Sequence, residues 1–360
     1  MNRELFSTFT LGRVELSNRM VMAPMTRCRA TPEHVPTPLM AEYYGQRASA
    51  GLIVTEGTSP APEGLGYARI PGLFNAEHVA AWRVVTDAVH AQGGRIFVQF
   101  MHTGRVSHPL NMPVGARVLA PSAVQLGGTM WTDAKGMQPH PAPEAMTEDD
   151  IAAVIRSFAA GAALAVEAGF DGVELHAANG YLLEQFLGVT TNKRTDRWGG
   201  SVENRLRFVL EVARATAGRI GADRVGMRIS PYGVFNEMQP DADTDALYER
   251  LASELSALGL VYLHVLDHSA QGAPPVPAAL KARLRAVFSG AMILAGGYDA
   301  SSAEADLAAG RADLIAFGRP FVANPDLVTR LRENAPLAAV AAGSLYTPGA
   351  KGYTDYPALA

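Results

Sequence analysis

The sequence predicts a (β/α)₈ barrel, an α/β fold in which eight parallel strands alternate with eight helices. Eight short apolar runs alternate with eight longer amphipathic segments along the 360 residues. The runs are continuously apolar rather than alternating, which is typical of parallel strands covered by helices. Polar or glycine-rich residues follow most of these runs. A doubly wound open sheet shares the same alternation and is the other architecture considered.

The predicted strands are short and apolar, and they are spaced along almost the whole chain. They lie near Met20–Pro24, Gly51–Thr55, Arg95–Phe100, Gly172–His176, Val225–Ile229, Val261–Leu266, Met292–Ala295 and Leu314–Phe317.

The predicted helices carry start and stop signals. Thr147 precedes an acidic first turn in "TEDD", and "DADTDAL" at 241–247 has the same pattern. Glycines at 93, 169, 259 and 310 follow four of the helices, where a left-handed residue is favoured. The helices lie near Pro38–Ser49, Ala76–Gln92, Glu148–Ala168, Val202–Ala217, Thr244–Leu258, Val276–Val287, Ser301–Ala309 and Asp326–Glu333.

Two segments extend the basic pattern, since a barrel of this kind takes about 250 residues. "FSTFTLGRVELSNR" alternates around Leu11–Gly12, which predicts a hairpin that closes the bottom of the barrel. Residues 102–146, after the third strand, are rich in Pro, Gly, His and Met and have no sustained period. Insertions of this length are usually functional. We therefore expect one barrel domain over 1–360, with 102–146 as a capping insertion over the strand ends.

Composition argues against several classes of protein. A net charge of −4 and the lack of a basic run disfavour a nucleic-acid partner. A single cysteine, Cys28, excludes a disulfide framework and an iron–sulfur cluster. The first residues do not resemble a secretory signal, and no apolar stretch reaches the roughly 18 residues that span a bilayer. We expect a soluble, cytoplasmic protein without a membrane partner.

Polar residues at the predicted strand ends define a candidate site, because active groups of barrel enzymes gather at that rim. Thr26, Gln99 and Arg228 end the first, third and fifth strands. Gln99 can instead be a core amide that bonds to the backbone, but a buried arginine needs an anionic or carbonyl partner. Together the three side chains could hold a planar, carbonyl-rich ring by hydrogen bonds.

The last two strands end in residues suited to phosphate. "AGG" supplies Gly296 and Gly297, and "FGR" supplies Gly318 beside the cation of Arg319. Barrels often bind phosphate between these two loops, although glycine pairs also mark ordinary turns. A phosphate seat beside a ring site suits flavin mononucleotide (FMN), but a phosphorylated sugar needs similar donors.

"HAANGY" places His176, Asn179 and Tyr181 where the fourth strand meets a helix. Two donors on one oxygen polarise a carbonyl, and a nearby phenol can donate a proton. A structural histidine and a packing tyrosine are the plainer interpretation. A metal site is not expected, since His-x-x-Asn is a poor ligand pair. We expect the other histidines near the rim to line the pocket or the surface, namely His102, His108, His140, His264 and His268.

The chain resembles the old yellow enzyme family of flavin-dependent ene-reductases. The most specific stretch is "HAANGYLLEQFLGVTTNKRTDRWGGSVENRLRFVLEV" at 176–212. Further similar segments include "NRMVMAPMTR", "GYARIPGLF", "VQFMHTGRVSH", "LAGGYDA", "IAFGRPFVANPDL" and "GYTDYP", so that the resemblance covers nearly the whole chain.

The resemblance implies a role for each matching residue. Thr26 would bond the flavin O4, Gln99 and Arg228 would hold the pyrimidine side of the ring, and His176 and Asn179 would bind the substrate oxygen. The residues expected against the ring are Pro24, Met25 and Gly57; those expected at the phosphate are Gly297, Gly318 and Arg319; those expected along the substrate cleft are Tyr67 and Tyr346.

The resemblance also implies the reaction. NADPH or NADH would reduce non-covalently bound FMN, and flavin N5 would pass hydride to an activated alkene while Tyr181 supplies the proton. Enones, maleimides, nitro compounds, nitrate esters and quinones would all be suitable acceptors. The chain departs from many relatives at Met101, often a bulky residue there, and at Trp198, usually tyrosine. Cys28 lies two residues past Thr26, a position where it should not contact the flavin.

Two other functions remain open from the residues themselves. A flavin-independent lyase or isomerase acting on a phosphorylated metabolite would share the phosphate seat, although such enzymes usually show a lysine or carboxylate base at a strand end. A non-catalytic flavin-binding sensor would need no Tyr181. We expect a monomer or a weak homo-oligomer.

Overall fold

Eight parallel strands close into a barrel in the computed structural model, which describes residues 4–359. Each strand is hydrogen-bonded to the next, and β14 pairs with β3 to complete the circle. This closure confirms the predicted barrel and excludes the open sheet. The strands are β3 (Met20–Met22), β4 (Leu52–Thr58), β5 (Ile96–Phe100), β10 (Gly172–Ala177), β11 (Val225–Ile229), β12 (Tyr262–Leu266), β13 (Ala291–Ala295) and β14 (Leu314–Phe317).

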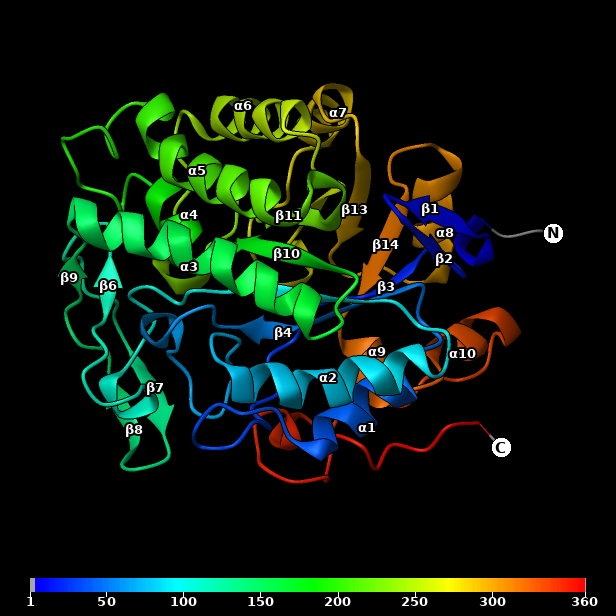
Figure 1. Cartoon of the computed structure of the whole chain (residues 1–360). Helices are drawn as coiled ribbons and strands as arrows, with labels where there is room; N and C mark the ends of the chain where they lie inside the picture. Colours follow the sequence, from blue (N-terminus) through cyan, green and yellow to red (C-terminus); the bar gives the residue numbers. More distant parts are fainter. Residues whose placement is uncertain (1–3, 360) are drawn as a thin grey trace.

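Helices surround the barrel, and all eight predicted ones are present (Figure 1). Thr147 and Asp150 form the predicted capping box of α3. The start signal of α6 works differently, because the carboxylate of Asp243 pairs with Arg205 and caps no backbone N–H. Within residues 4–359 no helix has the length and apolar character needed to cross a bilayer. The helices are α1 (Pro38–Gln46), α2 (Ala76–His90), α3 (Glu148–Glu167), α4 (Leu182–Leu187), α5 (Val202–Ile220), α6 (Thr244–Ala257), α7 (Ala278–Val287), α8 (Ala300–Ala308), α9 (Arg319–Ala323) and α10 (Leu327–Glu333).

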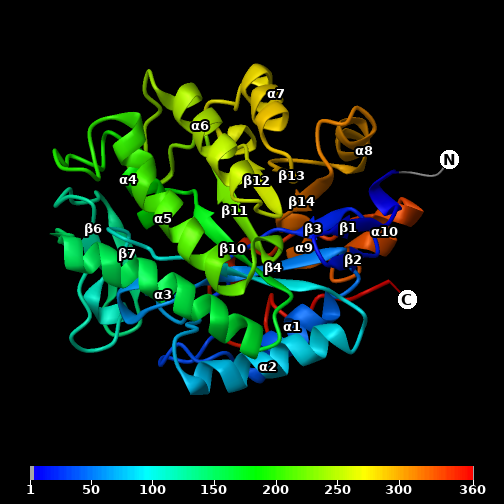
Figure 2. The same ribbon diagram turned by 45° about the horizontal axis from the view of Figure 1, so that its top comes forward.

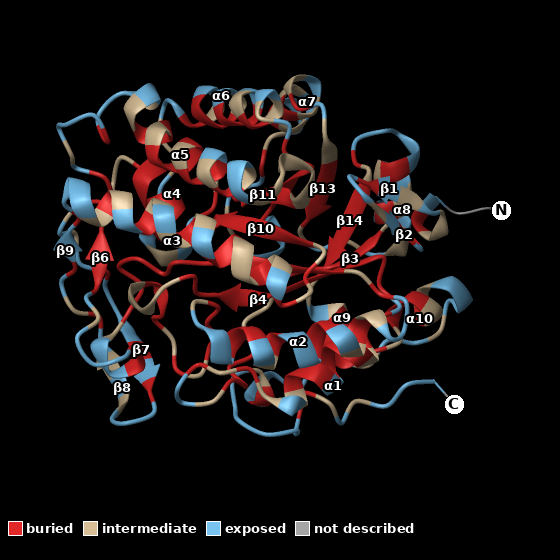
Figure 3. Ribbon diagram, in the orientation of Figure 1, coloured by how far each residue is buried: buried red, intermediate tan, exposed pale blue. Residues whose placement is uncertain are grey.

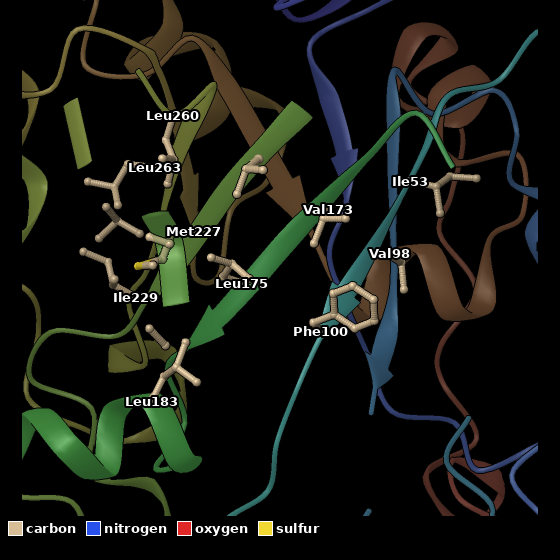
Figure 4. Close-up of a cluster of buried hydrophobic side chains, with 14 of the residues drawn as sticks. Ile53, Val98, Phe100, Val173, Leu175, Leu183, Met227, Ile229, Leu260 and Leu263 are labelled. Atoms are coloured by element: carbon tan, nitrogen blue, oxygen red, sulfur yellow. The ribbon is translucent and has the colours of Figure 1, made fainter. Parts of the chain in front are cut away.

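The strands bury both of their faces, which explains their continuous apolar runs. Alternate side chains such as Val173 and Leu175 point outward and pack under the helices (Figure 4). Side chains of the other parity point into the barrel, where Val54, Ile293 and Leu314 share a second apolar cluster. The same parity directs Glu174 and His176 inward.

A hairpin closes one end of the barrel, as predicted. β1 (Phe9–Leu11) pairs with β2 (Val14–Leu16), and Leu11 and Leu16 belong to the cluster inside the barrel. Gly12 turns the chain with φ of 57°, a left-handed conformation that favours glycine. A Cβ at this position would lie 2.4 Å from the carbonyl oxygen of Asp223, so the turn presses against the barrel's lower rim.

Residues 102–146 lie at the opposite end, toward which β4 points (Figures 1 and 2). They contain four short strands that the sequence did not predict, β6 (Leu119–Ala120), β7 (Thr129–Thr132), β8 (Gly136–Pro139) and β9 (Glu144–Ala145). β7 and β8 form an antiparallel hairpin whose surface is largely exposed (Figure 3). These strands are only two to four residues long, so no apolar period marks them in the sequence.

Candidate active site

The junction after β10 brings two of the predicted side chains together. His176 is the last inward residue of the strand and is 2% exposed. Asn179 follows in a left-handed conformation, φ 61°, that asparagine tolerates better than most residues. Its backbone N–H donates to Ser230 Oγ at 3.0 Å, and its Nδ2 lies 3.4 Å from His176 Nε2. The two polar groups therefore face the same space.

Tyr181 and Tyr67 meet beside this pair. Their hydroxyl oxygens are 3.1 Å apart, and the Tyr181 ring centroid lies 5.2 Å from that of His176. Burial raises the pKa of Tyr181 to about 12, so the phenol keeps its proton at neutral pH. Burial, together with the positive charge of Arg228, lowers the pKa of His176, which is therefore neutral. The site thus offers a protonated phenol beside an uncharged imidazole and an amide.

Several buried polar atoms at this mouth have no partner among residues 4–359. They include His176 Nδ1, Asn179 Oδ1 and Arg228 Nε. Arg228 is 5% exposed, and its guanidinium Nε has no hydrogen-bond partner among the described residues. Buried polar groups normally find partners, so these atoms indicate the seat of a ligand.

A buried network that the sequence did not reveal lies below the mouth. Glu174 accepts hydrogen bonds from Gln99 Nε2 at 2.7 Å, Tyr262 OH at 3.0 Å and His264 Nδ1 at 2.8 Å. His264 is fully buried inside the barrel, so it does not lie at the surface. A glutamate within an otherwise apolar strand was the signal that could have pointed to this network.

His102 does not lie at the surface either. It is fully buried, and its Nδ1 accepts a hydrogen bond from the backbone N–H of Gly104 at 3.2 Å. Burial lowers its pKa to about 3, so it is a neutral structural residue. Among residues 4–359, no three His, Cys, Asp or Glu side chains gather as a metal site would require.

A second buried carboxyl group fixes the loop that carries Asn179. Glu184 Oε2 accepts from Gly180 N at 2.6 Å, and Oε1 accepts from Ser230 Oγ at 2.7 Å and Tyr248 OH at 2.9 Å. Since Ser230 also accepts from Asn179 N, the network ties the loop to β11 and α6. Burial raises the pKa of Glu184 to about 7.

The residues predicted for phosphate follow β13 and β14 at the same rim as His176, because all eight strands are parallel. Arg319 is exposed and pairs with no acidic residue among those described. At Gly318 an added Cβ would meet only Met25 Sδ, at 3.5 Å, which leaves room for a ligand. Gly296 has another reason to be glycine: a Cβ there would lie 2.2 Å from the Asp267 carbonyl oxygen.

These features fit FMN. A buried, unpaired guanidinium and the free end of the Gln99 amide suit the carbonyl-rich edge of an isoalloxazine. An exposed arginine beside an open glycine suits the phosphate. Thr26, in the loop after β3, is partly exposed at the same rim.

An apolar cluster lines one side of the mouth. Met101 packs there with Cys28 and Leu65, and Tyr67 and Tyr181 lie at its edge. A Cβ at Gly57 would lie 2.6 Å from Met101 Sδ, so the thioether occupies the space that a larger residue at 57 would need. The phenol of Tyr346 is exposed near the entrance, and its carbonyl accepts from Arg69 Nη2 at 3.3 Å.

Comparison with known proteins gives one consistent result. Residues 4–338 match the profile of the NADH:flavin oxidoreductase / NADH oxidase family. The chain is 43% identical over 355 residues to a probable flavin mononucleotide-dependent alkene reductase of Leishmania infantum, covering 96% of this chain and 95% of that protein.

Solved structures agree with this family. Morphinone reductase in complex with tetrahydroNAD superposes with a TM-score of 0.94 at 43% identity, covering 100% of this chain and 98% of that one. The old yellow enzyme homologue from Zymomonas mobilis has a TM-score of 0.94 at 40% identity, with 99% and 100% coverage.

The residues alone had left open a flavin-independent lyase or isomerase and a non-catalytic sensor. These similarities argue against both functions. The chain belongs to the old yellow enzyme family, and it is an FMN-dependent NAD(P)H oxidoreductase of the alkene-reductase type.

Proposed function

We propose that this enzyme reduces the double bond of α,β-unsaturated carbonyl and nitro compounds, with Tyr181 as the proton donor. The observation that carries the proposal is the meeting of three groups at one mouth. The Tyr181 ring lies beside His176, which is paired with Asn179, and all three side chains are uncharged at neutral pH.

His176 and Asn179 bind the oxygen of the substrate. Each can donate an N–H, and two donors on one oxygen stabilise the negative charge that develops as the alkene is reduced. A neutral imidazole suits this task, because it remains a donor without releasing a full proton to the product. The left-handed backbone of Asn179, held by Ser230, keeps its amide in place.

Tyr181 then supplies the proton to the carbon next to the activating group. The product gains one hydride and one proton, so one NAD(P)H is oxidised for each alkene reduced. The Tyr67 hydroxyl, 3.1 Å away, can return a proton to Tyr181 after each turnover. Tyr346, exposed near the entrance, completes the substrate cleft.

Bound FMN supplies the hydride that it receives from NAD(P)H. We assign Arg228, Gln99 and Thr26 to the edge of its ring, and Arg319, Gly318, Gly297 and Gly296 to its phosphate. Pro24, Met25 and Gly57 come from the same rim and contact the ring. The fixed charge of Arg228 favours the added negative charge of the reduced ring.

The nicotinamide uses the same mouth as the alkene in this proposal. The complex of morphinone reductase with tetrahydroNAD, a relative that superposes over the whole chain, supports such a site. Residues 102–146 cap the mouth. Either NADPH or NADH serves as the reductant in this proposal, and the cytoplasmic location and a monomeric or weakly associated state remain predictions.

The test compares Tyr181→Phe with Tyr67→Phe. We expect Tyr181→Phe to lower the turnover of cyclohexenone by about 10²- to 10⁴-fold, the usual contribution of a positioned proton donor. Reduction of the flavin by NADPH or NADH, followed by its absorbance under anaerobic conditions, should stay within about twofold of the wild type.

Tyr67→Phe is the matched control, because it removes the neighbouring hydroxyl and leaves the donor in place. We expect it to lower turnover by no more than about tenfold. Equal turnover in the wild type and Tyr181→Phe, with FMN bound in both, would show that another group donates the proton.

A further inference from the structure

Glu174 has no role in the reaction described so far, yet it lies directly below the site. It comes two residues before His176 on β10, so both side chains point into the barrel. It is fully buried, and Gln99, Tyr262 and His264 all donate hydrogen bonds to it. Three donors hold this carboxylate in a fixed position inside the barrel.

The barrel leaves space for this arrangement. Gly226 stands opposite Tyr262 in the register of β11 and β12. A Cβ at Gly226 would lie 2.2 Å from Tyr262 Cζ, so the glycine lets the tyrosine ring lie across the strand. The ring then carries its hydroxyl to Glu174 Oε2.

The carboxyl group is ionised at neutral pH. Burial alone would raise its pKa, but His264, Arg228 and Gln99 outweigh this effect and the pKa lies below its ordinary value. His264 donates its Nδ1–H to this carboxylate, and burial lowers the pKa of His264 although the carboxylate opposes that effect. Glu174 is therefore a fixed negative charge that only accepts hydrogen bonds.

This charge determines which way the Gln99 amide faces. An acceptor-only partner requires the N–H₂ end of the amide, and Nε2 is indeed 2.7 Å from Glu174 Oε1. No donor among residues 4–359 reaches Gln99 Oε1, so the carbonyl end and the second N–H remain for a ligand. A ring edge that alternates N–H and C=O needs this pair of groups.

The charge also acts on Arg228. This guanidinium is buried on the next strand, paired in register with His176 on β10 and His264 on β12, and it bonds to no described side chain. Burial lowers its pKa, and Glu174 opposes that effect. Glu174 therefore helps to keep Arg228 charged and offsets part of its positive field.

We propose that Glu174 is a positioning residue of the FMN site, which orients the Gln99 amide toward the ring and lowers the flavin midpoint potential by offsetting Arg228. This inference rests on the proposed placement of the ring against Gln99 and Arg228.

Glu174→Gln tests the effect of the charge, because it removes the charge and keeps the size of the side chain, while one carboxylate oxygen becomes an N–H₂ donor. Without the negative charge, Arg228 should favour the reduced flavin more strongly. We expect the equilibrium constant for two-electron reduction to rise about tenfold, which equals about 30 mV. The potential is measured by equilibrium reduction of the holoenzyme against a reference dye.

Glu184→Gln is the matched control, since Glu184 is also buried and accepts three hydrogen bonds, but it lies on α4 and not on a strand of the barrel. It should leave the midpoint potential unchanged. If Glu174→Gln shifts the potential no more than Glu184→Gln does, the charge effect is wrong.

Glu174→Asp tests the orientation of Gln99, because it keeps the charge but shortens the reach by one methylene. We expect the dissociation constant of FMN, measured from the fluorescence of flavin released on dilution, to rise about tenfold. FMN retention equal to that of the wild type would overturn the orientation effect. Glu174→Asp decides the orientation effect even if circular dichroism shows that Glu174→Gln does not fold.

The wild-type enzyme separates this inference from the proposed function. If the wild type retains no FMN or reduces no alkene, the proposed function fails whatever happens at position 174. If the wild type does both and every Glu174 variant matches it, only the role of Glu174 is wrong.

Discussion

The pKa values of three buried glutamates near the mouth depend on the different groups that surround their carboxyl groups. Glu174 has three donors and the nearby cation of Arg228, and its pKa lies below the ordinary value. Glu184 has three donors but no cation, and burial raises its pKa to about 7. Glu56 Oε2 accepts from Arg27 N and Cys28 N, while Oε1 has no partner among the described residues. Burial raises its pKa to about 7 as well.

Glu56 should therefore make the stability of the enzyme depend on pH. Between pH 4.5 and about 7 the unfolded chain releases the proton of this carboxyl group while the folded protein retains it. The free energy of unfolding should accordingly fall as pH rises through this window, by about 3 kcal/mol from this group. In Glu56→Gln this contribution should disappear, which urea unfolding at pH 5, 6, 7 and 8 can measure.

The control for this experiment is Glu203→Gln, which changes a carboxylate that is 85% exposed. Its stability should follow the wild-type pH dependence. If the free energy of unfolding changes with pH in the same way in Glu56→Gln and in the wild type, Glu56 does not retain its proton in the folded protein.

At the scale of single residues, the sequence revealed the groups that sit at strand ends but not those inside the strands. His176, Asn179 and Tyr181 interrupt an apolar pattern at a junction, and the structure brings them together. Glu174 and His264 lie within strands that are apolar on both faces, where periodicity does not separate inward from outward positions. Their partners come from other strands, so only the closed barrel reveals the network.

At the scale of elements, the entrance is formed by three segments that meet at Arg69. Its Nε donates to the Cys28 carbonyl at 3.2 Å, and its Nη2 donates to the Tyr346 carbonyl. Its Nη1 pairs with Asp133 at the turn between β7 and β8, which also accepts from Trp131 Nε1 at 2.9 Å. One side chain thus ties the β7–β8 hairpin and the C-terminal segment to the loop after β3.

Asp133→Ala should loosen this entrance without touching the reacting groups. We expect the KM of a bulky enone to rise about threefold, because the hairpin and Tyr346 are held less firmly. The kcat should stay within about twofold, and stability should fall by about 1 kcal/mol, as for other partly exposed ion pairs. Steady-state kinetics with one bulky and one small enone, together with urea unfolding, measure these effects.

Glu144→Ala is the matched control within residues 102–146. Its carboxylate pairs with Arg117 at 3.1 Å and is 60% exposed, and it has no contact with Arg69 or Tyr346. It should leave both KM values unchanged. Identical kinetics in Asp133→Ala and Glu144→Ala would argue against a role of the Arg69 contacts in substrate access.

The longer apolar elements could be predicted from the sequence, and the short strands of residues 102–146 could not. β5 and β11 lie within one residue of their predicted bounds, because each is a short apolar run. The strands of residues 102–146 expose much of their surface, including Trp131 and Met137. Tertiary contacts of Arg69 and Asn111 hold this region in place, and no local pattern encodes them.

At the scale of the whole molecule, the two ends of the barrel have different tasks. The candidate site gathers where the strands end, beside residues 102–146, and the β1–β2 hairpin closes the other end (Figure 1). In barrels of this kind, changes at the bottom affect stability and changes at the top affect chemistry. The turn at Gly12 offers a direct test of this separation.

Gly12→Ala should destabilise the enzyme without slowing it. The new Cβ would meet the Asp223 carbonyl oxygen at 2.4 Å and Val261 Cγ2 at 2.9 Å, which lie before β11 and β12.

Gly310→Ala is the control, because its φ of 66° is close to the 57° of Gly12 but nothing lies within 4 Å of its Cβ. Left-handed strain should cost each variant about 1–2 kcal/mol, and overpacking should cost Gly12→Ala a further 1–3 kcal/mol, roughly. Both should keep kcat within about twofold, because Tyr181 lies at the opposite end. If urea unfolding shows that both variants lose the same free energy of unfolding, contacts between the hairpin and the lower rim of the barrel do not contribute to stability. If Gly12→Ala alone loses much of its kcat, the two ends of the barrel are coupled.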